Sequence, residues 1–366
     1  MREYFLIFVV AAAVTYATTP WVRKVAVRIG AMTAVRARDV HSVPIPRLGG
    51  VAMLLGFLAS VLVAARLQHL SQIFATTEIL GIVVGAILMT AVGAIDDVRE
   101  LDWLTKLAGQ MIAAGAMAFF GVQLLSLPLF GVTILPAPVL MALTIVIVLV
   151  TINAVNFIDG LDGLAAGIVA IASLSYFLYA YQLSFQYNPP NVFSTATFVT
   201  AALLGCCLGF LPHNVNPARL FMGDAGALLL GLLLAAATIS MLGNIDPSVE
   251  VDRNANLALV MPILLPLAIM SIPLLDMTLA VVRRTRRGQR PWHPDAQHLQ
   301  HRMLQLGHTH RGAVLLLYLW AAIIAFGVTS FAFVDGPLPV LAIMLGVLAA
   351  ILLTARLPEW LSRHRL

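Results

Sequence analysis

Charged residues are scarce in this chain of 366 residues: they make up 11% of it, whereas hydrophobic residues make up 60%. Soluble domains carry about 25% charged and about 45–50% apolar residues. The scarcity excludes a disordered chain, a coiled coil and a nucleic-acid-binding module built on a basic face. With a mean hydropathy of +0.94, the composition predicts an all-helical, polytopic integral membrane protein that has no nucleic-acid partner.

Cysteine and lysine are also rare. The two cysteines, Cys206 and Cys207, are adjacent inside an apolar run, which predicts neither a disulfide framework nor a thiolate metal site. Neither of the two lysines, Lys24 and Lys106, follows glycine, so the sequence has no Walker A loop. A GxGxxG motif and a GxSxG elbow are absent as well. These absences exclude the common nucleotide-binding loops and serine hydrolase sites.

Hydrophobic runs that are long enough to cross a bilayer recur along the whole chain. A span needs about 20 apolar residues, and a window of about 19 residues predicts eleven such runs. They cover residues 4–22, 49–66, 79–95, 107–125, 137–153, 164–181, 195–211, 225–242, 256–282, 312–333 and 338–355. The first run lacks a cleavage site and is expected to be a span, not a signal peptide. We expect a single transmembrane domain over residues 1–366.

The distribution of Arg and Lys predicts how these spans face. With the N-terminus outside and the C-terminus in the cytoplasm, 19 of the 22 basic residues fall in segments on the inner side. Cytoplasmic segments of membrane proteins carry such an excess. We therefore expect a multi-pass protein of the inner cell membrane in this orientation. The sequence shows no convincing internal repeat, which argues against an inverted-repeat transporter.

Polar residues concentrate in the inner segments. The first contains His41 and Arg47 around two prolines that keep the chain extended. Its arginines either set the topology or contact phosphate, and the sequence leaves both open. The second contains the pair Asp96 and Asp97, followed by Lys106. Because a carboxylate in hydrocarbon costs about 2.5–3.5 kcal/mol, we favour a cation-binding or proton-transfer role over a neutralised interfacial cap.

Amide and carboxylate side chains recur every third residue in the next inner segment: Asn153, Asn156, Asp159 and Asp162. On a helix this spacing brings neighbours to within about 60° of each other. Oxygen ligands without cysteine or histidine favour Mg²⁺, or alternatively Mn²⁺, over zinc. A buried hydrogen-bond network is the alternative interpretation. Asp224, between two glycines at a helix start, is either an N-cap or a further metal ligand.

The last inner segment between spans combines an arginine run with histidines. His298 and Arg302 are four residues apart with His301 beside them, so one helical face can present imidazoles and a guanidinium to phosphate or sugar. We expect the arginine run before them to anchor the topology and to contact anionic lipid. His308 and His310 are expected to face solvent. Oxygen ligands and guanidinium groups at a membrane surface together favour phosphoryl transfer with a lipid substrate.

These motifs resemble those of the polyprenyl-phosphate N-acetylhexosamine-1-phosphate transferases. The matching motifs, in the family's order, are HSVPIPRLGG, DDxxxL, NxxNxxDGxDGL, FMGDAG and DxxHLxHR. Two of them, HLxHR and FMGDAG, resemble the bacterial branch that transfers GlcNAc-1-phosphate from UDP-GlcNAc. The phospho-N-acetylmuramoyl-pentapeptide transferase branch typically carries three consecutive histidines, which this chain lacks, and it stays the nearest alternative. An ion-coupled secondary transporter is the alternative from another class.

The resemblance implies a Mg²⁺-dependent enzyme, the first membrane step of a cell-envelope glycan pathway, acting on UDP-GlcNAc and polyprenyl phosphate at the cytoplasmic face. The products would be polyprenyl-diphospho-GlcNAc and UMP. The lipid phosphate oxygen is expected to attack the β-phosphorus directly, with Mg²⁺ bridging the diphosphate, and a route through an aspartyl-phosphate is the competing scheme. The sequence leaves the oligomeric state, a homodimer included, open.

The resemblance also implies roles for individual residues. It assigns Asp224 and Asn156 to the metal ion. The catalytic residues that it implies are Asp96, Asp97, Asp159, Asp162 and His301, and the substrate-binding residues are His41, Arg47, Lys106, Asn153, His298 and Arg302. Relatives usually carry histidine where this chain has Gln300, so we expect no essential acid or base at that position.

Overall fold

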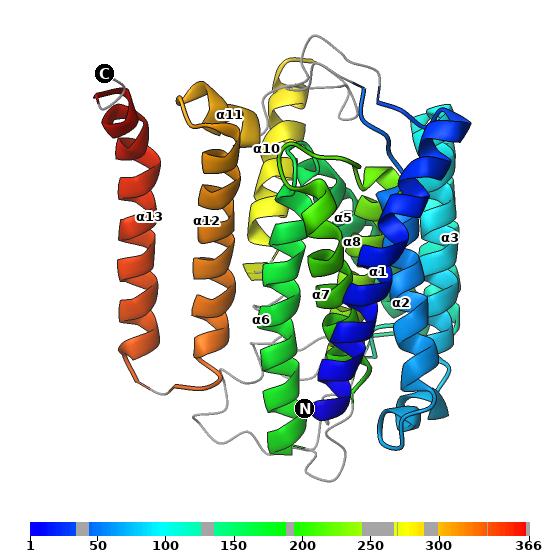
Figure 1. The fold of residues 1–366 in the computed structure, drawn as a ribbon. Coiled ribbons are helices and arrows are strands. Elements are labelled where there is room, and N and C mark those ends of the chain that lie inside the picture. The colour runs from blue at the N-terminus through cyan, green and yellow to red at the C-terminus, as the bar shows by residue number, and fades with distance from the viewer. Residues whose placement is uncertain are drawn as a thin grey trace.

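A computed structural model of the chain describes residues 1–33, 44–125, 135–187, 194–243, 267–268, 270–288, 299–334 and 336–363. Over these ranges the regular structure is helical, apart from one isolated bridge between Met32 and Pro46. The helices lie side by side as a bundle, and the two ends of the chain lie at opposite ends of it (Figure 1). The predicted all-helical class is confirmed.

In chain order, the first eight α-helices are α1 (Arg2–Ile29), α2 (Gly49–Ala64), α3 (Glu78–Arg99), α4 (Trp103–Phe119), α5 (Ala137–Ile158), α6 (Leu164–Tyr187), α7 (Thr195–Asn214) and α8 (Gly223–Gly243). A short 3-10 helix, η1 (Leu70–Ala75), lies between α2 and α3. The remaining helices are α10 (Ser271–Arg286), α11 (Leu299–Gln305), α12 (His310–Ser330) and α13 (Leu338–Arg363).

Eight helices of the described ranges are long and apolar enough to cross a membrane: α1, α3, α5, α6, α7, α8, α12 and α13. Each corresponds to one of the eleven predicted spans. Helices α2 and α4 coincide with two further predictions but have only 16 and 17 residues. The prediction over residues 256–282 lies partly outside the described residues, and α10 extends beyond its end. The chain is therefore a multi-pass helical protein, with eight of the eleven predicted spans supported by length and composition.

Helix α8 forms the centre of the bundle and α13 its edge. In the apolar windows of these helices, 89% of the residues of α8 are buried but only 11% of those of α13, which stands outermost beside α12 (Figure 1). Two glycines let other helices approach the first turn of α8. A Cβ atom on Gly50 would lie 2.1 Å from the backbone nitrogen of Gly226, and one on Gly93 would lie 2.4 Å from that of Ala225. Helices α2 and α3 thus meet α8 backbone to backbone.

Helix α3 is longer than predicted and carries the aspartate pair in its last turn. The hydrophobic run ends near residue 95, yet the helix continues to Arg99. Its end is closed by Asp96, whose backbone carbonyl accepts the N–H of Glu100 at 2.9 Å and whose side chain accepts the N–H of Leu101 at 2.7 Å. Helix α4 then begins at once, because the side chain of Asp102 accepts the N–H groups of its first turn.

The polar motifs meet at one end of the bundle, the upper end in Figure 1. This end holds the last turns of α3 and α5, the first turns of α4 and α8, and helix α11, whereas the N-terminus of the chain lies at the other end. The motifs share this end because successive helices alternate in direction. The expectation that they lie on one side of the protein agrees with this arrangement.

Candidate active site

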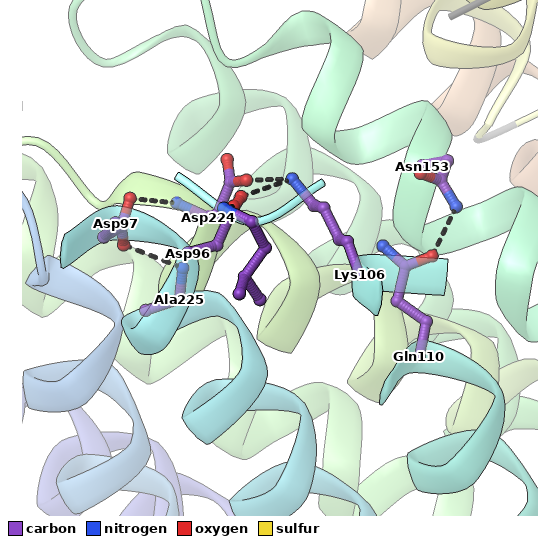
Figure 2. Close-up of polar contacts among 8 residues, drawn as sticks. Asp96, Asp97, Lys106, Gln110, Asn153, Asp224 and Ala225 are labelled. Carbon is purple, nitrogen blue, oxygen red and sulfur yellow. Dashed lines mark hydrogen bonds and ion pairs between the residues drawn. The ribbon is translucent and has the colours of Figure 1, made fainter. Parts of the chain in front are cut away.

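Lys106, in the first turn of α4, joins carboxylates from two other helices. Its Nζ donates to Oδ2 of Asp96 on α3 at 2.8 Å and to Oδ2 of Asp224 on α8 (Figure 2). All three side chains are largely shielded from solvent. The ammonium offsets the repulsion that two neighbouring carboxylates would otherwise feel. Three residues that are far apart in the sequence therefore form one charged cluster.

Asp97, the neighbour of Asp96, binds the backbone of α8 instead. Its Oδ1 accepts the N–H of Asp224 at 2.9 Å and its Oδ2 accepts the N–H of Ala225 at 3.1 Å (Figure 2). The side chain is buried, with 6% of the residue exposed. The first amides of a helix lack intrahelical acceptors and attract negative charge. Gly223 permits this contact, since its φ is +67° and a Cβ atom there would collide with the Asp97 carboxylate.

The first inner motif reaches the same place through its backbone. Phe221 donates its N–H to the carbonyl of Pro46 at 2.9 Å, and its own carbonyl accepts the N–H of Gly49 at 3.0 Å. Arg47, between them in sequence, donates from Nε to Oγ1 of Thr33 at 2.7 Å. Two backbone hydrogen bonds therefore join this motif to the segment that leads into α8. His41, also predicted as a substrate contact, lies outside the described residues.

Asp159 follows the last residue of α5 and is half-buried. Burial is the main reason that its pKa is raised to about 8, and the nearby carboxylates of Asp224 and Asp97 raise it further, against the charge of Arg47. A carboxyl group with a pKa near neutrality can hold or release a proton during a reaction. A carboxyl group with this pKa would suit the catalytic role expected of Asp159.

Asp162 holds the segment between α7 and α8. Its Oδ2 accepts Nδ2–H of Asn216 at 2.9 Å and the N–H of Ala218 at 3.0 Å, and its own N–H donates to Nε2 of His310 at 3.2 Å. The residue is buried. The sequence left two interpretations open for this motif, a metal site and a buried hydrogen-bond network. The contacts of Asp162 are those of a buried hydrogen-bond network.

Asn153 makes a contact that the sequence did not indicate. Its Nδ2 donates to Oε1 of Gln110 at 3.1 Å (Figure 2). It also donates to the carbonyl of Leu149 at 2.8 Å. Gln110 is buried on α4, one turn after Lys106. A polar residue four positions after a lysine in an otherwise apolar helix was the available signal. Asn156, one turn after Asn153 on α5, is half-buried.

The histidine motif is only partly described. Arg302 is exposed on α11, while His298 and the side chains of Gln300 and His301 lie outside the described residues. The expectation that the two following histidines face solvent is wrong. His308 is 4% exposed and its Nε2 lies 3.0 Å from the carbonyl of Thr354 on α13. His310 is half-buried, and its Nε2 accepts the N–H of Asp162.

A metal ion would find a small set of oxygen donors at this end of the bundle. Within the described ranges, no three His, Cys, Asp or Glu side chains form a ligand group. Asp96 and Asp224 do converge, and they hold the cationic group of Lys106 between them. Mg²⁺ is usually bound by one or two carboxylates together with substrate phosphates, so this donor set fits Mg²⁺ bound jointly with a substrate.

Comparison with known proteins gives one consistent family. Residues 79–242 match the family model of glycosyl transferase family 4. A decaprenyl-phosphate N-acetylglucosaminephosphotransferase of Mycolicibacterium smegmatis is 43% identical over 97% of this chain and 88% of its own length. That of Mycobacterium tuberculosis is 41% identical over 95% and 87%. An undecaprenyl-phosphate alpha-N-acetylglucosaminyl 1-phosphate transferase of Yersinia pestis is 30% identical over 83% and 77%. The chain therefore belongs to the family of these polyprenyl-phosphate N-acetylglucosamine-phosphate transferases, and its residues 79–242 form a glycosyl transferase family 4 domain.

Proposed function

We propose that this chain is an enzyme that transfers GlcNAc-1-phosphate from UDP-GlcNAc to a polyprenyl phosphate, giving polyprenyl-diphospho-GlcNAc and UMP. The observation that carries the proposal is the bridge from Lys106 to Asp96 and Asp224 at the end of the bundle where the other motifs meet. The names of relatives that are similar over nearly the whole chain support it. Residues 1–366 would act as one transmembrane catalytic domain.

Lys106 is the residue that we assign to the lipid phosphate. Its ammonium is held in place by Asp96, so it can pair with a phosphate without a large rearrangement of the side chain. A phosphate monoester is largely ionised at neutral pH, so its oxygen can attack without a strong base. That oxygen forms a bond to the β-phosphorus of UDP-GlcNAc while the bond from this phosphorus to the UMP oxygen breaks.

Asp224 and Asn156 would hold Mg²⁺, with Asp96 near enough to contribute. When bound, the ion neutralises charge on the diphosphate during transfer. Asp97 would orient Asp224 for this role, because its carboxylate accepts the backbone N–H groups of Asp224 itself and of Ala225. Asp159 can take up or release a proton near neutral pH, and Arg47 supplies positive charge to the same region.

The nucleotide sugar would lie toward the remaining motifs. We assign His298, His301 and Arg302 to the sugar and the diphosphate, His41 and Arg47 to phosphate contacts, and Asn153 to the wall of the site. Asp162 would support the site from behind, since its carboxylate binds the segment that precedes α8. These roles follow the positions of the motifs in the chain and the hydrogen bonds of Asp162 and Asn153.

We also propose the orientation and the location. With eleven spans, an outer N-terminus and an inner C-terminus, the motif end of the bundle faces the cytoplasm, where UDP-GlcNAc is available. The excess of Arg and Lys in the segments at this end supports that orientation. The proposed location is the inner cell membrane. Blue-native electrophoresis would decide between a monomer and a homodimer.

One assay tests the proposed reaction. Purified protein is incubated with radiolabelled UDP-GlcNAc, polyprenyl phosphate and Mg²⁺, and the product is extracted into organic solvent. Labelled lipid is expected in the organic phase and UMP in the aqueous phase. Lipid product from UDP-MurNAc-pentapeptide in place of UDP-GlcNAc would instead assign the chain to peptidoglycan synthesis. No labelled lipid from either donor would refute the transferase and favour a transporter.

A further inference from the structure

Helix α10 buries two charged side chains on one stripe. Asp276 is 2% exposed, Arg284 is 4% exposed, and Ala280 between them is fully buried. Residues four positions apart lie on the same face of a helix, so this face of α10 points into the bundle. Arg286 and Arg287 are exposed and fit the expected topology anchor. Arg284, from the same arginine run, does not.

The two ends of this stripe contact two different motifs. At one end, the guanidinium carbon of Arg284 lies 5.3 Å from the ring centroid of Phe157, which follows Asn156 on α5. At the other end, Oδ1 of Asp276 accepts the N–H of Leu299 at 2.8 Å. Leu299 is the first residue of α11. Helix α10 therefore lies between the motif on α5 and the helix that carries the histidine motif.

Helix α11 is too short to be stable without contacts to other parts of the protein. It has seven residues, and an isolated helix of fewer than about 12 residues is not stable in water. The first N–H groups of a helix have no acceptor within it. A buried carboxylate is itself costly unless it is hydrogen-bonded. The contact between Asp276 and Leu299 satisfies an orphan amide of α11 and gives the buried carboxylate a hydrogen-bond donor.

We propose that Asp276 is a positioning residue of the transferase, which fixes the start of α11 and thereby the place of His301 and Arg302. The proposal rests on the proposed function, because it matters only if those two residues bind the nucleotide sugar. Asp276 acts through Leu299 and contacts no substrate. Loss of the contact would therefore weaken binding of UDP-GlcNAc and leave binding of the polyprenyl phosphate unchanged.

Three variants separate this role from general stability. Asp276→Leu removes the acceptor at similar volume, and Asp276→Asn keeps an acceptor at Oδ1 as the matched control. Leu299→Pro removes the donor at a first helical position, where proline is tolerated. Steady-state kinetics give KM for each substrate and kcat. Hydrogen–deuterium exchange over residues 299–305 measures the protection of α11.

We expect Asp276→Leu and Leu299→Pro each to raise KM for UDP-GlcNAc by about tenfold or more, the loss typical of a hydrogen bond to a charged group. Exchange in α11 should be faster, and KM for polyprenyl phosphate should not change. In the double variant the combined effect should be less than the sum of the two single effects, because both single variants remove the contact between Asp276 and Leu299. Asp276→Asn should stay within about threefold of wild type.

Wild-type exchange in α11 of Asp276→Leu would overturn the proposal, and so would an equal rise in both KM values. If Asp276→Leu does not fold, Leu299→Pro against Asp276→Asn gives the same decision. A wild-type protein that makes no labelled lipid would refute the proposed function instead. The exchange measurement would still report whether Asp276 holds α11.

Discussion

The carboxylate of Asp97 on α3 accepts the backbone N–H of Asp224, the second residue of α8, at 2.9 Å. Asp97 also accepts the next amide, that of Ala225, at 3.1 Å. Both acceptor oxygens are thus engaged with the helix that presents the Asp224 carboxylate to Lys106. Asp96 therefore belongs to the charged cluster with Lys106 and Asp224, whereas Asp97 holds the start of α8, which carries Asp224.

The Asp97 contact predicts a loss of stability when the side chain is removed. Asp97→Ala would leave two amides of α8 without an acceptor, and a hydrogen bond to a charged group contributes about 1.5–3 kcal/mol. We expect a lower midpoint of thermal unfolding in detergent together with loss of activity. Asp97→Asn, which keeps one acceptor, should lose less stability. If Asp97→Ala is inactive but unfolds at the wild-type temperature, Asp97 acts in the chemistry and not through α8.

Because the Lys106 ammonium binds the carboxylates of Asp96 and Asp224, we expect it to compete with a divalent cation for them. Lys106→Met leaves the carboxylates of Asp96 and Asp224 without their bound positive charge. We expect the metal-free variant to unfold at a lower temperature than wild type, and Mg²⁺ to raise its midpoint by more than it raises that of wild type. A ligand that binds only the folded state stabilises it more the more tightly it binds. Lys106→Arg, which keeps the charge, is the control.

An equal effect of Mg²⁺ on Lys106→Met, Lys106→Arg and wild type would contradict this prediction. It would mean that the metal ion binds away from the Lys106 cluster. Activity provides a second readout, because Lys106→Met should raise KM for polyprenyl phosphate more than KM for UDP-GlcNAc. The opposite order would reassign Lys106 to the diphosphate of the nucleotide sugar.

Asp159 predicts a pH dependence of stability. Its pKa is about 8 in the folded protein and about 3.9 in an unfolded chain. Between these values the folded state binds more protons than the unfolded state, so the contribution of Asp159 to the free energy of unfolding falls as pH rises. The contribution is fully present below about pH 4 and is lost as pH passes through about 8.

Thermal unfolding in metal-free buffer between pH 5 and pH 8 tests this sign. We expect the midpoint to fall less steeply with pH in Asp159→Asn than in wild type. Asp102→Asn is a suitable control, because hydrogen bonds to Thr105 lower the pKa of Asp102 and its titration lies below this range. Parallel curves for Asp159→Asn and wild type would show that the carboxyl of Asp159 is ionised throughout.

The sequence predicted the helical class and the meeting of the motifs, but not how neighbouring side chains divide their tasks. Hydropathy locates helices because each span must be apolar, and alternation of direction then places Lys106 and Asp224 at one end. Asp96 and Asp97 point in directions about 100° apart on α3. Which of them faces Lys106 therefore depends on how α3 is rotated about its axis when it packs against its neighbours. The burial of His308 depends likewise on α13, which is remote in sequence.

A substitution of Asp162 can distinguish a structural role of this residue from a role in proton transfer. Its carboxylate accepts two hydrogen bonds from the segment before α8, and an asparagine in its place keeps an acceptor for one of them. A general acid or base contributes about 10²–10⁴-fold to the rate. If Asp162 transferred a proton, Asp162→Asn would therefore lower kcat by at least about 10²-fold. As a structural contact it should lose less than about tenfold in kcat, whereas Asp162→Leu should unfold at a lower temperature. Asp224→Asn, measured in the same lipid-extraction assay, should lose all activity, and a similar loss in Asp162→Asn would return Asp162 to the catalytic residues.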